Sequence, residues 1–304
     1  MIRCDIEYVV STLKGERLWA SLWWGVSYMD LDKNGLGMGG IASGIDLNAP
    51  MEEQEAQQLR SWFLECQVLC IRGQSLTPHQ FADVGRIFGE PQVQLLGDYR
   101  LNDPPEVTVI SNYNKMAGGK PHVRATHWHT DDSYFATPAK ATALFSVALP
   151  STQTRTEFIN THAVLEHMPD HLRARIEGRQ AVHKYHSRRG KAIVAIRTPE
   201  EEALTPDVAH PLIRTHPETR RQSLYINPNR IDNIVGMDEV ESDALLDELY
   251  DFAFQEQFQY AHYWELGHMV IWDNRCTMHR ATTNFEITER REFQRLLLKG
   301  DKPV

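Results

Sequence analysis

The residue types best suited to metal chemistry gather in one short segment, His127-Trp128-His129-Thr130-Asp131-Asp132. In an extended chain, alternate residues point to the same side, so the imidazole of His129 and the carboxylate of Asp131 would face one point. Two histidines and one carboxylate on one face of a metal leave three positions open, as oxygen chemistry at non-haem iron(II) requires. The segment therefore predicts two ligands of such a site, and a distant histidine would have to supply the third.

Spacing alone leaves other ligand sets open. His127 shares a face with His129, and Asp132 competes with Asp131, so an all-histidine site of the cupin kind fits the same alternation. A His-x-Asp pattern also arises easily by chance in 304 residues with 14 histidines. Only a third ligand can decide between these interpretations, because the complete facial set is what identifies the site.

The elements that would position these residues are mostly strands. Apolar runs and alternation predict strands at 68–73, 106–111, 141–149, 180–186, 210–216, 223–227, 269–274 and 293–300. Helical spacing and capping residues predict helices at 51–67, 78–88, about 160–177 and about 238–256. Strands without regular helix alternation argue against a parallel doubly wound sheet. We therefore expect a mainly β fold with flanking helices, a double-stranded β-helix or jelly roll.

Composition excludes several classes of partner. The chain carries a formal net charge of −9 and no basic block, which argues against nucleic acid and anionic membranes as partners. No apolar run of about 18 residues occurs, so no transmembrane helix is expected, and a cytoplasmic protein is the default. Four scattered cysteines without a C-x-x-C pair indicate reduced, mostly buried thiols rather than a disulfide framework.

Two segments stand apart from the regular pattern. Residues 1–34 do not show the pattern of apolar and polar residues that the rest of the chain shows, and we expect them to form an N-terminal extension of uncertain role. A single catalytic domain is expected over residues 35–304. Residues 187–207 are mostly polar and show no clear period. A loop of this length in a compact domain is usually a functional lid or a disordered insertion, and we expect 187–207 to be a lid over the site.

The C-terminal segment narrows the alternatives for the metal site. It reads WDNRCTMHRATTNFEITERREFQRLLLKGDKP, with Trp272-Asp273-Asn274-Arg275 followed by His279 and then by several arginines. Together with Trp128-His129-Thr130-Asp131, this order of motifs resembles the family of taurine dioxygenase and 2,4-dichlorophenoxyacetate dioxygenase, over roughly residues 35 to 303. The resemblance implies an iron(II)- and 2-oxoglutarate-dependent dioxygenase whose metal ligands are His129, Asp131 and His279.

The resemblance also implies how the co-substrate is held. Thr156 lies where the family has a threonine that bonds 2-oxoglutarate, although Gln153-Thr154-Arg155 precedes it here instead of the usual Gly-Gly-Asp. In the family's RR-x-x-x-R pattern the second arginine of the pair holds the far carboxylate, which implies that Arg291 has this role. Arg295 is then expected near the 1-carboxylate or a substrate anion. Strand alternation places Arg291 and Arg295 on one face and Arg290 on the other.

The implied reaction is hydroxylation of an unactivated C–H of a small substrate by O2, with release of succinate and CO2. Arg188, Arg189 and Arg230 lie in segments that by resemblance border the substrate, and with Trp128 they are the expected substrate contacts. These arginines favour an anionic substrate, a carboxylate above all. A homo-oligomer would be in keeping with the family.

Two rival interpretations use the same residues. A cupin-like metalloenzyme would keep the metal but would not use 2-oxoglutarate, and Arg291 and Arg295 argue against it. A jelly-roll binding protein would have lost turnover, and the intact ligand set argues against that.

Overall fold

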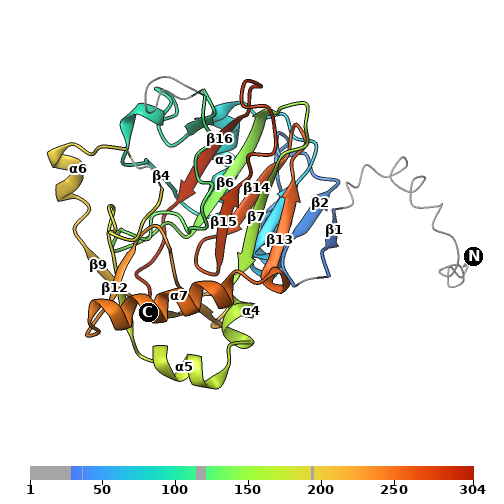
Figure 1. Cartoon of the computed structure of the whole chain (residues 1–304). Helices are drawn as coiled ribbons and strands as arrows, with labels where there is room; N and C mark the ends of the chain where they lie inside the picture. The colour runs from blue at the N-terminus through green and yellow to red at the C-terminus, as the bar shows by residue number, and fades with distance from the viewer. Residues whose placement is uncertain (1–28, 36, 114–120, 193–194) are drawn as a thin grey trace, which may run out of the picture.

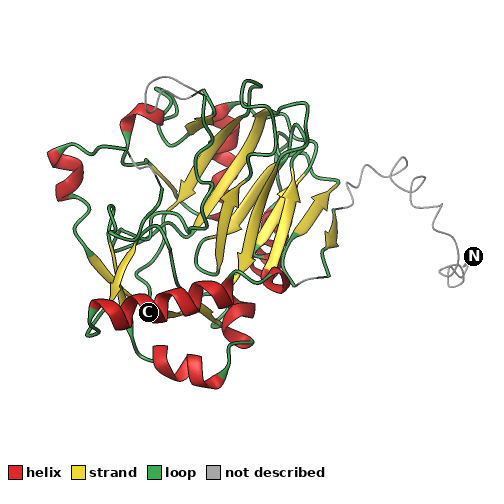
Figure 2. Ribbon diagram, viewed as in Figure 1, coloured by secondary structure: helices red, strands yellow, loops and turns green. Residues whose placement is uncertain are grey.

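The computed structural model describes residues 29–35, 37–113, 121–192 and 195–304, so the expectation for residues 1–28 lies outside it. Strands form the centre of the molecule and helices lie on its outer faces (Figures 1 and 2). The fold is therefore mainly β with flanking helices, as the sequence predicts. Within the described residues, no helix is both long enough and apolar enough to cross a bilayer.

The larger sheet has eight strands. Their order is β1 (Asp30–Lys33), β2 (Gly40–Ser43), β3 (Val68–Ile71), β14 (Met269–Asp273), β6 (Ala141–Ala148), β16 (Glu292–Leu298) and β4 (Pro91–Gln92), and β5 (Thr108–Ser111) also pairs with β16. The strands predicted at 68–73, 106–111, 141–149, 269–274 and 293–300 are thereby confirmed. Strand β1 lies before residue 35 and pairs with β2, so the sheet begins inside the range that the sequence assigns to an extension.

A sheet of three strands carries much of the site. It runs in the order β13 (Gln259–Tyr263), β7 (Arg155–Asn160) and β15 (Thr277–Ala281), and all its pairings are antiparallel. Sequence patterning did not identify any of the three. Strand β7 reads RTEFIN and β15 reads TMHRA, so polar residues interrupt the apolar signal on which a prediction depends.

Two small sheets contain the other strands of the described residues. One has the order β12 (Ile231–Ile234), β8 (Gln180–His183) and β9 (Val208–Pro211), and the other pairs β10 (Ile213–Thr215) with β11 (Gln222–Leu224). The strand predicted at 210–216 is therefore divided between two sheets.

The larger sheet is buried on both faces. Alternate residues such as Val270 and Trp272 of β14 face the inside, where they pack with Phe158 of β7. The residues between them, including Ile271, contact the outer helices α2 (Glu53–Cys66) and α3 (Pro78–Phe88). Thr77 caps α3 by accepting from the amide of Gln80. The space between the two sheets is thus a closed core into which site residues project.

The remaining helices cover the small sheets. Helix α7 (Glu239–Ala253) packs with α4 (Thr161–Glu166) and α5 (Asp170–Ile176) over a separate apolar core. A single helix was predicted over about 160–177, and the structure divides it at Pro169, which precedes α5. The 187–207 segment contains the short helix α6 (Pro199–Ala203). Short 3-10 turns lie at Gly97–Tyr99 and Glu256–Phe258. Cys66, Cys70 and Cys276 are buried free thiols, as expected.

Candidate active site

Three side chains from distant segments converge on one point between the sheets. His129 Nε2 lies 3.9 Å from Asp131 Oδ1, and His279 Nε2 lies 3.7 Å from Asp131 Oδ2. The three potential ligand atoms all lie within 4.8 Å of one another. They line a cavity of about 210 Å³. The structure therefore brings together the two histidines and the carboxylate that the motifs select.

Backbone pairing sets the two histidines side by side. The amide of His129 donates to the carbonyl of His279 at 3.1 Å, and the amide of His279 donates back at 2.8 Å. Their ring centroids are 4.1 Å apart as a result. The chain then turns, since Asp132 has a φ of 56°, in the left-handed region. This turn directs the side chain of Asp132 away from that of Asp131. The carboxylate of Asp132 instead accepts a hydrogen bond from Gln92 Nε2 at 3.0 Å.

The protonation state of the histidines suits metal binding. His129 Nδ1 lies 2.9 Å from the carbonyl oxygen of His127, so this nitrogen carries the proton and Nε2 keeps its lone pair toward the other ligands. Burial lowers the pKa of His129 and lowers that of His279 to about 3, which keeps both rings neutral. His127 contributes its carbonyl, and its own ring is exposed and outside the cluster.

A buried hydrogen-bonded chain supports the carboxylate of Asp131. Thr142 Oγ1 donates to Asp131 Oδ2 at 2.6 Å, and Asn274 Nδ2 donates to Thr142 Oγ1 at 2.9 Å. Trp272 Nε1 in turn donates to Asn274 Oδ1 at 3.1 Å. Burial alone would raise the pKa of Asp131, but His279, Arg295, His129 and the Thr142 hydroxyl lower it to about 2. Sequence reasoning missed Thr142, because nothing in an apolar strand marks one hydroxyl as a support.

The remaining polar residues of the Trp272–Arg275 motif form a buried ion pair. Asp273 accepts from Arg275 Nη2 at 2.6 Å and Nε at 2.8 Å, and from His216 Nε2 at 3.0 Å. Cys276 lies beside this group, so the cluster has metal-ligand residue types. The carboxylate of Asp273 is already neutralised by Arg275. We therefore interpret Asp273 and Arg275 as a structural ion pair that fixes the turn before β15.

Arg291 is a buried cation without an anion. Its side chain sits over the ring of Phe293 at 4.4 Å, and its Nε donates to Thr154 Oγ1 at 3.3 Å. Only 5% of the residue is exposed, and among the described residues no carboxylate forms an ion pair with it. Burial lowers the pKa of its guanidinium to about 10. Such a group needs an anion in the cavity that it lines.

Two further residues line the same cavity beside Arg291. Thr156 Oγ1 accepts from Trp264 Nε1 at 2.9 Å, which leaves its hydroxyl proton free to donate to a ligand. Arg295 Nη1 lies 3.8 Å from Asp131 Oδ1, so this arginine is at the metal side of the cavity. Arg290 instead pairs with Glu292 at the surface, and 63% of its side chain is exposed. The expected division between the two faces of this strand is thereby confirmed.

A further part of the cavity lining, here called the opposite wall, is aromatic and basic and contains Tyr99, Arg124, Tyr134, Tyr185 and Arg230. Arg230 lies 4.8 Å from the ring centre of Tyr134 and 5.0 Å from that of Tyr185, and it donates to the Tyr185 carbonyl. Arg124 lies 4.0 Å over the ring of Tyr99. Neither arginine forms an ion pair with a carboxylate of the described chain. Arg230 was predicted at this wall, whereas Arg124 was missed because its segment has no periodic pattern.

Three residues expected at the substrate lie elsewhere. Arg188 donates to both carboxylate oxygens of Asp243 on α7, at 2.8 and 2.6 Å, and Arg189 pairs with Asp243 at 2.6 Å. Acidic residues of α7 therefore hold both arginines away from the cavity. Trp128 packs in the core against Phe254, with ring centres 6.0 Å apart. None of the three lines the cavity in this structure, so the geometry does not support their expected role as substrate contacts, which stays a prediction.

Comparison with known proteins agrees with this geometry. The family model described as taurine catabolism dioxygenase TauD, TfdA family matches residues 33–297. The chain is 29% identical over 269 residues to the (S)-phenoxypropionate/alpha-ketoglutarate-dioxygenase of Sphingobium herbicidovorans, covering 86% of this chain and 92% of the relative. It is 30% identical over 276 residues to the alpha-ketoglutarate-dependent 2,4-dichlorophenoxyacetate dioxygenase of Cupriavidus pinatubonensis, covering 86% of this chain and 94% of the relative.

A solved structure supports the same relationship. The crystal structure of AAD-2 in complex with Mn(II) and N-oxalylglycine matches with a TM-score of 0.77 at 28% identity, covering 91% of this chain and 99% of that chain. The match of the family model over most of the sequence confirms the resemblance seen in the motifs. The chain belongs to the taurine catabolism dioxygenase TauD, TfdA family.

Proposed function

We propose that this protein is an iron(II)- and 2-oxoglutarate-dependent dioxygenase that hydroxylates a small anionic substrate. The observation that carries the proposal is the cavity in which His129, Asp131 and His279 face one point and Arg291 stands buried without a counter-ion. Two neutral imidazoles and one carboxylate suit iron(II). A dicarboxylate that reaches from this point to Arg291 would neutralise the arginine.

The chain's own residues would bind and orient the co-substrate. Arg291 would hold the far carboxylate of 2-oxoglutarate through charge-assisted hydrogen bonds, and the Thr156 hydroxyl would donate to the same group. Arg295 would lie at the end nearer the metal, since it already approaches Asp131. The match to a protein crystallised with Mn(II) and N-oxalylglycine supports this arrangement. When bound, iron(II) with 2-oxoglutarate and O2 supplies the oxidising power for C–H hydroxylation, with release of succinate and CO2.

The substrate class is inferred from the opposite wall. Arg230 and Arg124 offer two guanidinium groups beside tyrosine rings, and within the described residues neither forms an ion pair. The carboxyl group of Asp132 lines the same cavity and interacts electrostatically with Arg230 without forming an ion pair with it. A small carboxylate with an aromatic or apolar body fits such a wall. The names of the relatives in Sphingobium and Cupriavidus include phenoxypropionate and 2,4-dichlorophenoxyacetate, which are carboxylates of this kind. We therefore propose aryloxy carboxylates as the first substrates to test.

The segment 187–207 is proposed to cover this wall. Ala192 and Ala195 line the cavity, and the carbonyl of Ala195 accepts from the Tyr185 hydroxyl at 3.0 Å. The two facing sheets are proposed to form a double-stranded β-helix, or jelly roll, which would place both sets of inward residues around one metal. The cytoplasmic location and the homo-oligomeric state stay predictions.

The rival functions differ in what they require of Arg291. A cupin-like enzyme without 2-oxoglutarate would have no anion for this buried arginine, and its burial would then only cost stability. A binding protein without turnover would keep the pocket but release no succinate. The test measures succinate from the purified chain with iron(II), 2-oxoglutarate and a panel of aryloxy carboxylates, sulfonates and neutral amines.

The expected result is substrate-dependent succinate that N-oxalylglycine suppresses and that the His279→Ala variant does not produce. Succinate formation that persists in this variant would overturn the assigned iron site. Metal-dependent turnover without 2-oxoglutarate would favour the cupin-like enzyme. Faster coupled turnover of a neutral amine than of any acid would overturn the substrate class.

A further inference from the structure

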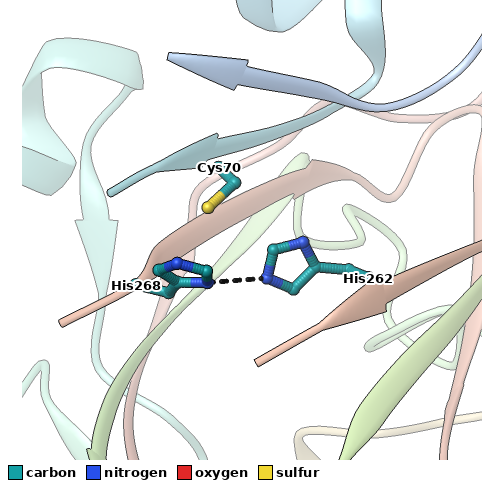
Figure 3. A group of neighbouring side chains, drawn as sticks. All are labelled: Cys70, His262 and His268. Atoms are coloured by element: carbon teal, nitrogen blue, oxygen red, sulfur yellow. Dashed lines mark hydrogen bonds between the residues drawn. The ribbon is translucent and has the colours of Figure 1, made fainter. Parts of the chain in front are cut away.

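A second cluster of metal-ligand residues lies between the sheets, apart from the iron site. Cys70 belongs to β3, His262 to β13, and His268 precedes β14. Figure 3 shows the thiol and both imidazoles pointing toward one another. The three residues are 1%, 2% and 4% exposed, so the group is deeply buried. It does not include any residue proposed to bind iron or 2-oxoglutarate.

The separations fit a tetrahedral metal ion. His262 Nε2 and His268 Nδ1 are 3.2 Å apart, and the three ligand atoms lie within 4.8 Å of one another. Zinc bound at about 2.0–2.1 Å by nitrogen and about 2.3 Å by sulfur would place two nitrogens ~3.4 Å apart and sulfur ~3.6 Å from each. The nitrogen pair is already close to this spacing, and the Cys70 sulfur, which lies within 4.8 Å of both nitrogens, would sit at about the required separation or move closer.

The outer nitrogens of both rings meet groups that would set the required tautomers. His268 Nε2 lies 3.5 Å from Glu265 Oε2, and His262 Nδ1 lies 3.5 Å from the Tyr260 hydroxyl. A carboxylate behind a metal-bound histidine commonly fixes its ring and raises its basicity. His268 Nδ1 already accepts from the Glu265 backbone amide at 3.3 Å, which places the ring proton on Nε2, and it also lies 3.2 Å from His262 Nε2. A cation between these two nitrogens would replace the hydrogen bond that joins them and would require the proton of His262 on Nδ1.

A cavity beside the cluster gives a metal ion access to it. Burial raises the pKa of the Cys70 thiol to about 12, so the thiolate would form only when a bound cation offsets its charge. A cavity of about 340 Å³ is lined by His262 and His268 together with Glu265, Asp32 and Arg72. This cavity supplies the entry path that a metal site needs and space for a water ligand.

We propose that Cys70, His262 and His268 bind a zinc ion, with a water molecule from the adjoining cavity as the fourth ligand. Cys70 would bind as the thiolate and its proton would pass to solvent. One thiolate and two imidazoles are a ligand set that zinc accepts. The inference does not depend on the proposed dioxygenase function, because the two sites share no residue.

The site would lie directly behind the co-substrate pocket. His262 is opposite Thr156 in the β13–β7 pairing, and the Trp264 ring packs on His262 with centroids 5.0 Å apart. The same tryptophan donates to the Thr156 hydroxyl. Zinc at this position would join three segments, β3, β13 and the turn before β14, and would thereby hold Trp264 behind the pocket.

The experiment uses the full chain with His129→Ala and Asp131→Ala substitutions, which remove the iron site. After metal is stripped with a chelator, the protein is titrated with Co²⁺ and then with Zn²⁺. Binding at Cys70 should give a thiolate-to-cobalt charge-transfer band that saturates at one equivalent and disappears when zinc displaces cobalt. The iron site offers no thiolate, so the band separates the two sites.

Three further variants assign the band. Cys70→Ser should abolish it, and Cys276→Ser should keep it, although Cys276 is also buried beside a histidine and an aspartate. Glu265→Gln changes a side chain that is 70% exposed, so folding should be unaffected while zinc affinity falls about tenfold to a hundredfold. No band in the chain that retains Cys70, or a band that survives Cys70→Ser, would overturn the proposal and leave the cluster as a hydrogen-bonded part of the core.

Discussion

The support of the Asp131 carboxylate by Thr142 can be tested with one nearly isosteric change. Thr142→Val keeps the shape of the side chain but removes the hydroxyl that donates to Asp131 Oδ2 at 2.6 Å. Thr142 is fully buried, so water cannot replace the lost donor. A hydrogen bond to a charged group contributes about 1.5–3 kcal/mol. Because about 1.4 kcal/mol corresponds to a factor of ten, iron(II) affinity should fall roughly tenfold to a hundredfold.

The same change should also reduce the stability of the fold. Asn274 Nδ2 now donates to the Thr142 hydroxyl, and in the variant it would be a buried donor without an acceptor, which costs about 1–3 kcal/mol. The assay therefore needs two readouts, metal affinity by competition with a chromophoric chelator and the free energy of unfolding by urea. Thr142→Ser restores the hydroxyl and should recover most of both.

A matched control separates metal affinity from general destabilisation. Thr277 is equally buried, but its hydroxyl donates to the neutral carbonyl of Asp273 at 2.8 Å. Thr277→Val should lower the free energy of unfolding by about 1 kcal/mol and leave iron affinity unchanged. If Thr142→Val binds iron as tightly as the parent chain, the hydroxyl does not support the ligand and the reasoning is refuted.

Three other predictions concern the arginines and histidines of the site. Arg291→Met should raise the KM for 2-oxoglutarate at least about tenfold, because it removes a charge-assisted pair, whereas Arg290→Met should leave this KM unchanged. A larger increase of KM in Arg290→Met than in Arg291→Met, measured by steady-state kinetics, would show that the assignment is wrong. His127→Ala should retain iron, because only the carbonyl of His127 contacts the site, and His129→Ala should lose it, as metal analysis would show. Arg230→Met should raise KM for carboxylates but not for neutral analogues, and equal increases for both would contradict a charge role.

Much of the site could be predicted because it depends on local alternation. Arg291 lies just before β16 and Arg295 within it, and both line the cavity, whereas Arg290 points to the surface. The two-residue period separates these two groups, and the resemblance to the family indicates which group faces the cavity. His129 and Asp131 also point to one side, even though the chain turns immediately after Asp131. The turn at Asp132 does not change the relative direction of the His129 and Asp131 side chains, because both residues precede it.

The parts that could not be predicted depend on contacts between distant segments. Thr142 of β6 supports Asp131 only because the turn that contains Asp131 folds against β6. Asn274 reaches Thr142 because β14, which ends just before Asn274, lies beside β6, and no local pattern contains either contact. Arg188 and Arg189 were expected near the substrate from their position in the sequence. Asp243 on α7 decides their direction instead, and its position depends on how the helix packs over β12.

Charge compensation separates the buried arginines into structural and functional groups. Arg275 is 2% exposed and its guanidinium is held by Asp273, so the pair is complete within the fold. Arg214 is likewise buried and pairs with Asp301 at 3.0 Å. Arg291 is as inaccessible as these, but among the described residues it has only the Thr154 hydroxyl as a polar side-chain partner. An isolated buried charge costs several kcal/mol, and a chain of this size has only about 5–15 kcal/mol of net stability. A fold that keeps such a group gains from it only when an anion is bound, so the incomplete pair at Arg291 is the strongest physical argument that the cavity binds a carboxylate.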